Sequence, residues 1–140
     1  MMNSSATVSA ELGLSLVVPD HGSVPLVASL YYNAEDPYAI RMAFHVGTDE
    51  PVEWIFARDL LAVGLEGPAG EGDVQVWPAD DDDRQVLNIA LSSPFGEAQF
   101  EAPRDSTAAF LARTYEVIAP GHESDYIDVD AELDELLWRA

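Results

Sequence analysis

Apolar and polar residues alternate along most of this chain with the period of two that predicts β-strands. The first predicted strand spans residues 7–18, and strands at 24–33 and 38–46 follow it. Turns rich in proline, glycine, asparagine and aspartate separate them at 19–23 and 33–37. The apolar face of the first strand consists of Val8, Ala10, Leu12, Leu14, Leu16 and Val18. This pattern predicts consecutive antiparallel strands joined by short turns.

In the segment 52–65 the spacing of the apolar residues changes halfway from that of a strand to that of a helix. The segment begins as a fourth strand with large apolar side chains on one face, and we place Trp54 in the core on this pattern. From Ala57 on, apolar residues recur at helical spacing. We expect Gly64 to end this short helix in the left-handed conformation, which glycine adopts at little cost, with Leu65 folded back onto the helix.

The second half of the chain repeats this plan. The alternation predicts further strands at 72–78, 85–92 and 97–102. An acidic hairpin loop is expected at 79–83, and the turn Pro94–Gly96 joins the last two strands.

Two helices are predicted after these strands. Asp105 or Ser106 is the expected N-cap of the first helix, and Asp128 or Asp130 that of the last. The element order therefore predicts an α+β fold for a single domain over residues 1–140. It comprises two antiparallel β-sheets, one of four strands and one of three to four strands, with a helix between them and two C-terminal helices.

The charge balance limits the partners of this domain. Among its 140 residues are 26 acidic and six basic ones, for a net charge of −20, and there is no lysine. Nucleic acid and anionic membrane surfaces are poor partners for such a chain, because both attract Lys/Arg-rich surfaces. The acidity is typical of a soluble protein, and alternatively it provides an acidic face for a basic patch on another protein.

Cysteine is also absent, which excludes disulfides, thiol nucleophiles and cysteine-ligated metals. The first residues lack the pattern of a signal peptide, and no apolar run reaches the ~18 residues of a membrane span. We therefore expect a soluble, intracellular protein.

Candidate catalytic or metal-binding residues are few. The run Asp80–Asp83 lacks the spacing of a calcium-binding loop and is better explained as a solvated hairpin tip. His21, His45 and His122 fall in separate segments without a metal-binding motif. We expect no enzymatic activity, no metal and no cofactor.

Tryptophans provide the candidate contact residues. Trp77 lies on the strand face opposite Val74 and Val76, where it either packs under a helix or lies on an oligomer surface. Trp138 adjoins Arg139, and this combination is enriched at protein interfaces, although a terminal tryptophan often serves only to dock its helix. We take Trp77, Trp138 and Arg139 as possible partner or oligomer contacts.

Several motifs occur in order along nearly the whole chain: residues 36–40 with Phe44, 52–61 with Gly64, Leu65, Pro68 and Gly70, then 72–78, 90–94, 96–98 and 102–103. Together they resemble the SsgA-like family of actinomycete sporulation and cell-division regulators, of the SsgA/SsgB type. The acidic run at 80–83 has no counterpart in this match.

The resemblance implies a non-enzymatic regulator of sporulation-specific division, cytoplasmic and located at the division septum. Its implied action is the recruitment or control of FtsZ or of cell-wall machinery, with FtsZ or another SsgA-like protein as partner. The implied fold has two sheets with helices, is similar to the Whirly class of single-stranded nucleic-acid binders, and assembles as a homotrimer without membrane insertion.

Two alternatives come from other functional classes. One is a single-stranded nucleic-acid-binding module of Whirly-like fold, which the −20 charge opposes. The other is a metal-dependent hydrolase that uses the aspartates.

Overall fold

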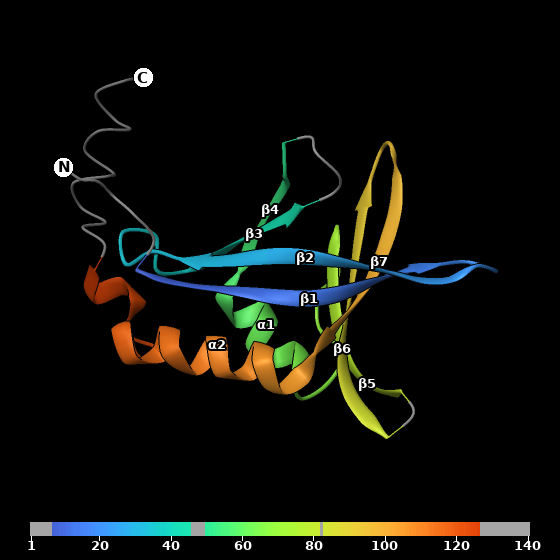
Figure 1. Cartoon of the computed structure of the whole chain (residues 1–140). Coiled ribbons are helices and arrows are strands. Elements are labelled where there is room, and N and C mark those ends of the chain that lie inside the picture. Colours follow the sequence, from blue (N-terminus) through green and yellow to red (C-terminus); the bar gives the residue numbers. More distant parts are fainter. Residues whose placement is uncertain (1–6, 46–49, 82, 127–140) are drawn as a thin grey trace.

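The protein was analysed as a computed structural model, which describes residues 7–45, 50–81 and 83–126 (Figure 1). Its elements, in chain order, are β1 (Val8–Val18), β2 (Gly22–Tyr32), β3 (Ala39–His45), β4 (Val52–Ala57), α1 (Arg58–Gly64), β5 (Val74–Asp81), β6 (Arg84–Ser93), β7 (Gly96–Pro103), α2 (Arg104–Val117) and the 3₁₀ turn η1 (Glu123–Tyr126). Each strand and both α-helices match a predicted element, with ends that differ by a few residues.

All seven strands belong to one antiparallel sheet in the order β4-β3-β2-β1-β7-β6-β5. The α+β class is thus confirmed, but the prediction of two separate sheets is wrong. Ser15 pairs with Glu101 and Leu16 pairs with Phe100, and these two pairs alone join β1 to β7 in the register. Beyond this narrow junction β5, β6 and β7 run across the direction of β1 and β2 (Figure 1). The likeness to Whirly proteins remains a prediction.

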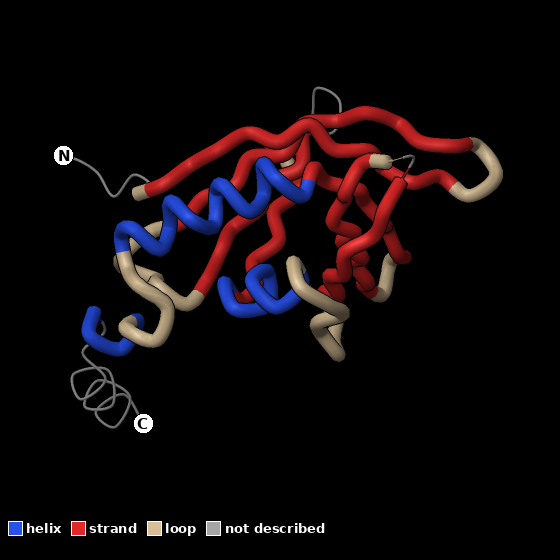
Figure 2. Tube along the Cα trace, turned by 90° about the horizontal axis from the view of Figure 1, so that it is seen from below, coloured by secondary structure: helices blue, strands red, loops and turns tan. Residues whose placement is uncertain are grey.

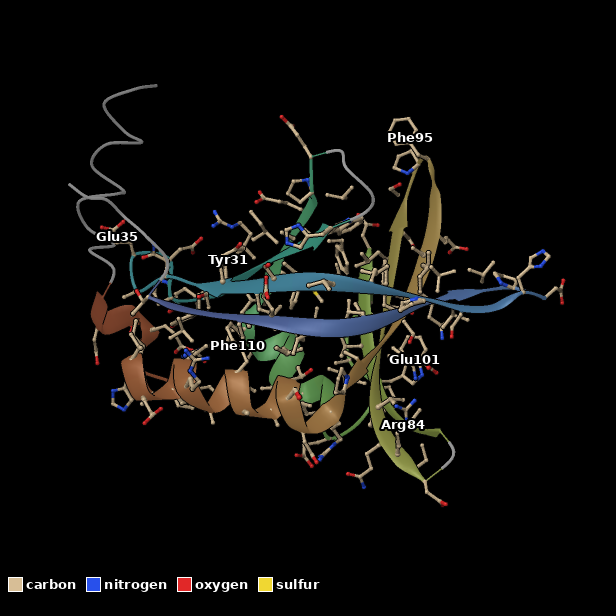
Figure 3. The ribbon with its side chains drawn as sticks, viewed as in Figure 1. Tyr31, Glu35, Arg84, Phe95, Glu101 and Phe110 are labelled. Atoms are coloured by element: carbon tan, nitrogen blue, oxygen red, sulfur yellow. The ribbon has the colours of Figure 1, made fainter. Side chains whose placement is uncertain are left out.

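The core fills the inner side of this curled sheet. Alternate residues of the strands point into it, as the hydrophobic pattern predicted. Both α1 and α2 pack against the same side of the sheet, and Phe110 of α2 is fully buried there (Figures 2 and 3). The rings of Phe44 and Phe100 stack with centroids 4.5 Å apart, so β3 and β7 meet across the interior.

The hairpin between β5 and β6 is tighter than expected. The predicted loop at 79–83 is wrong, because β5 continues to Asp81, which pairs with Arg84. Asp83 takes a positive φ of 67°, a conformation common in two-residue hairpin loops. Pro78 is tolerated within β5 because this strand is at the edge of the sheet.

Gly64 has a different role from the predicted one. It is helical, and the C-cap Leu65 keeps a right-handed φ of −70° with its N–H bonded to the Leu61 carbonyl at 3.1 Å. A Cβ on Gly64 would lie 2.6 Å from Val76 Cβ and closer still to Val76 Cγ1. The glycine is therefore needed for close approach of α1 to β5, which single-chain periodicity does not reveal.

The ends of α2 also differ from the prediction. Pro103, and neither Asp105 nor Ser106, is the N-cap, and no side chain caps the helix. Thr107 Oγ1 donates to the Pro103 carbonyl at 2.8 Å, while Asp105 lies in the first turn, where its charge favours the helix dipole. The predicted last helix from Asp128 or Asp130 lies outside the described residues.

A Gly64→Ala variant tests the close contact of α1 with β5. In an open helix this change stabilises by about 1 kcal/mol through helix propensity. Here we expect a loss of about 1–3 kcal/mol from overpacking against Val76, measured by urea unfolding.

The control is Gly13→Ala, where a Cβ meets no atom within 4 Å and stability should change little. The double variant Gly64→Ala/Val76→Ala should recover part of the loss. A Gly64→Ala protein more stable than wild type would contradict the packing role.

Candidate functional site

The structure places one of the three predicted contact residues. Trp77 is half-buried on β5 and pairs with Asn88 on the outer face of the sheet. Val76, the residue before Trp77, is the one that faces α1. Trp77 therefore does not pack under α1, as one of its two predicted roles required. The alternative role of Trp77, on an oligomer surface, remains a prediction. Trp138 and Arg139 lie outside the described residues.

His45 and His122 have ordinary side-chain partners. His45 Nε2 lies 2.9 Å from Ser29 Oγ, and His122 Nδ1 lies 3.1 Å from Asp125 Oδ2. Within residues 7–45, 50–81 and 83–126, no three histidine or carboxylate side chains are grouped to hold a metal ion. None of the helices in these ranges is long and apolar enough to cross a membrane.

A buried arginine at the start of α1 is the strongest polar feature that sequence reasoning missed. Arg58 is 2% exposed. Its Nη1 donates to the carbonyl of Ile118 at 2.8 Å and to that of Thr114 at 3.3 Å. Its Nη2 donates to Glu123 Oε2 at 2.9 Å in a salt bridge whose carboxylate side chain is 13% exposed. Arg58 thereby joins the start of α1 to the end of α2 and to η1.

Two aromatic rings complete the surroundings of this guanidinium. Arg58 Cζ lies 4.9 Å from the ring centroids of both Tyr32 and Tyr115, within the range of cation–π attraction. Tyr32 is fixed in turn, because its hydroxyl donates to the Pro37 carbonyl at 2.9 Å. The cation is therefore held between two rings and a row of oxygen acceptors.

The electrostatics of this cluster favour a structural role. The hydrogen bond from Arg58 lowers the pKa of Glu123 below its ordinary 4.5, so this carboxylate stays ionised at neutral pH. Burial raises the pKa of Tyr115 above 10.0, so its hydroxyl stays neutral. Neither group is poised to exchange a proton near pH 7, and the arginine has no nucleophilic atom.

Sequence reasoning missed Arg58 because its contacts are non-local. Thr114, Ile118 and Glu123 lie 56, 60 and 65 residues away along the chain. One signal was available in the sequence. Arg58 stands beside the apolar residues that begin α1, and in an amphipathic helix only one face is exposed, so a polar residue at this position is not necessarily exposed.

An apolar groove opens where the β6–β7 hairpin approaches β3 and β4, and we name it the Phe95 groove. It has a volume of about 310 Å³ and is lined by Phe44, Val52, Trp54, Leu91, Ser93, Phe95, Gly96, Glu97, Ala98 and Phe100. The stacked rings of Phe44 and Phe100 belong to both the groove and the core.

The apolar residues at the rim of the groove are more exposed than those of its floor. Phe95 is 99% exposed at the hairpin tip and points away from the body of the protein (Figure 3). Val52 is 51% exposed, and Trp54, which we predicted in the core, is half-buried and packs against the edge of the core. The alternation on β4 was interpreted correctly, but burial on this face falls from Phe56 to Val52, so the core covers the end of the strand and not its beginning.

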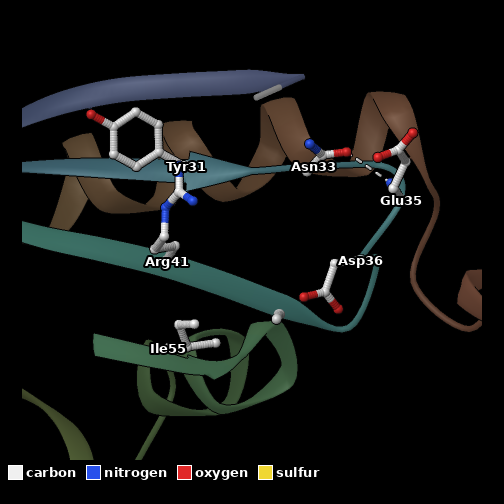
Figure 4. Close-up of a pocket in the computed structure, with 7 residues that line it drawn as sticks. Tyr31, Asn33, Glu35, Asp36, Arg41 and Ile55 are labelled. Atoms are coloured by element: carbon white, nitrogen blue, oxygen red, sulfur yellow. Dashed lines mark hydrogen bonds between the residues drawn. The ribbon is translucent and has the colours of Figure 1, made fainter. Parts of the chain in front are cut away.

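A second depression lies on the outer face near the β2–β3 turn (Figure 4). The Arg41 guanidinium lies over the Tyr31 ring at 4.7 Å, and Arg41 Nε lies 3.7 Å from Glu53 Oε2. Ile55 is 63% exposed beside them. Aromatic, arginine and aliphatic side chains together are typical of protein contact surfaces.

Most of the described arginines are engaged within the protein, which leaves its surface acidic. Their partners are Glu53 for Arg41, Glu123 for Arg58, the Leu65 carbonyl for Arg104 and the Ser9 carbonyl for Arg113. With a net charge of −20, the chain attracts cationic surfaces and repels anionic ones.

Comparison with known proteins places these features in a family. Residues 26–123 match the family model described as Streptomyces sporulation and cell division protein, SsgA. The sporulation-specific cell division protein SsgB of Thermobifida fusca is 58% identical over 137 residues, which are 98% of this chain and 99% of that protein. The SsgB protein of Streptomyces coelicolor is 50% identical over 133 residues, or 95% and 97% of the two chains.

Solved structures agree with the sequence matches. The crystal structure of the SsgA-like protein from Thermobifida fusca has a TM-score of 0.85 to this chain at 58% identity, covering 96% of this chain and 98% of that one. A structure from a study of SsgB mutations and longitudinal cell division in Streptomyces coelicolor also has a TM-score of 0.85, at 49% identity and with 91% and 100% coverage.

The Arg58 cluster makes a stability prediction. An Arg58→Met variant keeps much of the side-chain volume but removes the donor to the Ile118 carbonyl and to Glu123 Oε2, and it breaks the buried ion pair. We expect a loss of about 3–5 kcal/mol in the free energy of unfolding, measured with urea. The control Arg113→Met, at an exposed position, should stay within about 0.5 kcal/mol of wild type. Equal effects of the two changes would contradict the proposed role of Arg58.

The lowered pKa of Glu123 predicts a pH dependence. Wild type should be more stable than Glu123→Gln at neutral pH, because the ionised carboxylate interacts with Arg58 in the folded state. This advantage should be constant well above pH 4.5, decline below it and vanish once the pH falls below the lowered folded pKa.

Unfolding of both proteins between neutral and acidic pH measures this difference. Glu66→Gln is the control, since that side chain is 83% exposed and 3.7 Å from Arg104, and it should change stability little at any pH. An advantage of wild type over Glu123→Gln that persists unchanged in acid would show that the ion pair is not its source.

Proposed function

This chain belongs to the SsgA family of sporulation and cell-division proteins, and on that basis we propose that it regulates sporulation-specific cell division through protein–protein contacts at the division septum. The observation that carries the proposal is the 58% identity to an SsgB protein across 98% of the chain. The proposed role is non-enzymatic and cytoplasmic, and the partners are FtsZ, another SsgA-like protein or the cell-wall machinery.

Two described surfaces support a binding role. The Phe95 groove exposes Phe95 and Val52, and the depression around Tyr31 and Arg41 combines an aromatic ring with a guanidinium. Both compositions are enriched at protein interfaces. The −20 charge argues against nucleic acid as the partner, because binding to phosphate requires clustered cations.

We further propose that the chain forms a homotrimer. The β1–β2 hairpin extends past β7 as an arm (Figure 1), beyond the last β1–β7 pair at Leu16. Val24, opposite Leu16 at the base of this arm, is 49% exposed, and Val27, opposite Gly13 and nearer the body of the sheet, is 44% exposed. An apolar arm that leaves the body of a domain is suited to pack against another copy. Trp77, Trp138 and Arg139 remain proposed contacts with an oligomer partner or another protein.

Deletion of the gene in its sporulating host tests the division role. We expect missing or misplaced sporulation septa, restored by the wild-type gene, and a fluorescently tagged copy at the septa. A deletion strain with normal septa, together with a tagged copy spread through the cytoplasm, would refute the proposal.

Light scattering tests the trimer. The wild-type mass should be three times the 15.2 kDa of one chain. Val24→Ser/Val27→Ser should shift the mass toward that of one chain, whereas Val63→Ser, which changes a 52% exposed valine on α1, should not. A wild-type mass near 15.2 kDa would rule the trimer out.

A further inference from the structure

We propose that the Phe95 groove binds an amphipathic, basic segment of a partner protein, with Phe95 as the aromatic anchor at its rim. This inference rests on the proposed function, because it assigns a surface and a partner chemistry to protein contacts of this family member.

The hairpin tip holds Phe95 in the exposed position. Ser93 and Gly96 pair across a two-residue loop, so the tip is a tight turn. The Phe95 N–H donates to Ser93 Oγ at 3.1 Å, and Ser93 Oγ donates to the Gly96 carbonyl at 3.4 Å. Pro94 restricts its own backbone, and Gly96 takes a φ of 142°, which favours glycine. The local backbone thus keeps a 99% exposed phenyl ring directed at solvent.

Behind this ring, buried and closely packed apolar side chains form the floor of the groove. Phe44 and Phe100 are buried and stacked at 4.5 Å, and Leu91 is 5% exposed. Val52 is half-exposed and Trp54 half-buried on the β4 side. A large apolar side chain of a partner that enters here contacts the surface of the core itself, which favours binding through bulky hydrophobic residues.

The negative charge around the groove favours a positively charged binding partner. The charged residue among those lining the groove is Glu97, and Glu50 is exposed just before β4. Arg41, the cation paired with Glu53 at 3.7 Å, lies on the outer face in the other depression. A second copy of this chain would bring a further charge of −20, whereas a segment with Lys or Arg beside its apolar residues meets a complementary field.

A pair of synthetic peptides provides the test. Both contain the same leucines and lysines, but in one the leucines recur at i, i+3, i+4 and i+7 so that they form one face of a helix, and in the other the order is scrambled. Each labelled peptide is titrated with the full-length protein, and binding is followed by fluorescence anisotropy at low and physiological salt.

We expect the patterned peptide to bind at least ~10-fold more tightly than the scrambled one, and Phe95→Ser to weaken its binding at least ~5-fold. Phe95→Ser should leave the melting temperature unchanged, because the side chain is 99% exposed. Val63→Ser, at another half-exposed apolar position, should bind as wild type does. Glu97→Gln should weaken binding more at low than at high salt.

Three results would overturn the inference. Equal binding of the two peptides would indicate attraction by net charge alone, and unchanged binding by Phe95→Ser would place the site elsewhere. A change in the light-scattering mass of Phe95→Ser would assign the groove to contacts between copies of this chain. The septation experiment tests the proposed function separately, so a failed peptide test alongside defective septa would refute only the groove assignment.

Discussion

The ion pair and hydrogen bonds of Arg58 are the constraint on which much of the architecture depends. A guanidinium that is 2% exposed is stable only when its acceptors are all in place, because an unpaired buried charge carries a large desolvation penalty. Those acceptors come from the end of α2 and from η1, while the cation comes from the start of α1. The three segments must therefore assemble together, which fixes the start of α1, the end of α2 and η1 relative to one another.

Local patterns predicted the fold's elements well because alternation is a property of each strand alone. Val8–Val18 shows the expected alternation of buried and exposed residues, whereas four consecutive residues of β6, 86–89, are all buried. Arrangement was harder to predict. The β1–β7 junction depends on two residue pairs, too short to leave a periodic signal, so two sheets were predicted where one exists. In the sequence, Gly64 cannot be distinguished from a glycine that ends a helix. Only the short distance from its position to Val76 reveals its packing role.

The candidate site was less predictable than the fold because it depends on segments that meet only after folding. Composition indicated an acidic protein, with a basic partner as one of two interpretations of its charge. The family resemblance indicated a role in sporulation and cell division, which the match over residues 26–123 confirms. The Phe95 groove combines β3 and β4 with the β6–β7 hairpin, and no local motif links them. One clue was present: a phenylalanine at the tip of a tight turn has no neighbouring core to enter, so the turn Pro94–Gly96 already implied an exposed ring.

The two-pair junction between β1 and β7 has a consequence for how such a domain can diversify. Few backbone hydrogen bonds fix the angle between the two parts of the sheet, so side-chain packing such as the stacked Phe44 and Phe100 has a large share in setting it. Substitutions at these rings can change that angle while every hairpin keeps its own register. Because the same rings form the floor of the groove, a change in core volume at these positions reshapes the groove without redesigning any strand.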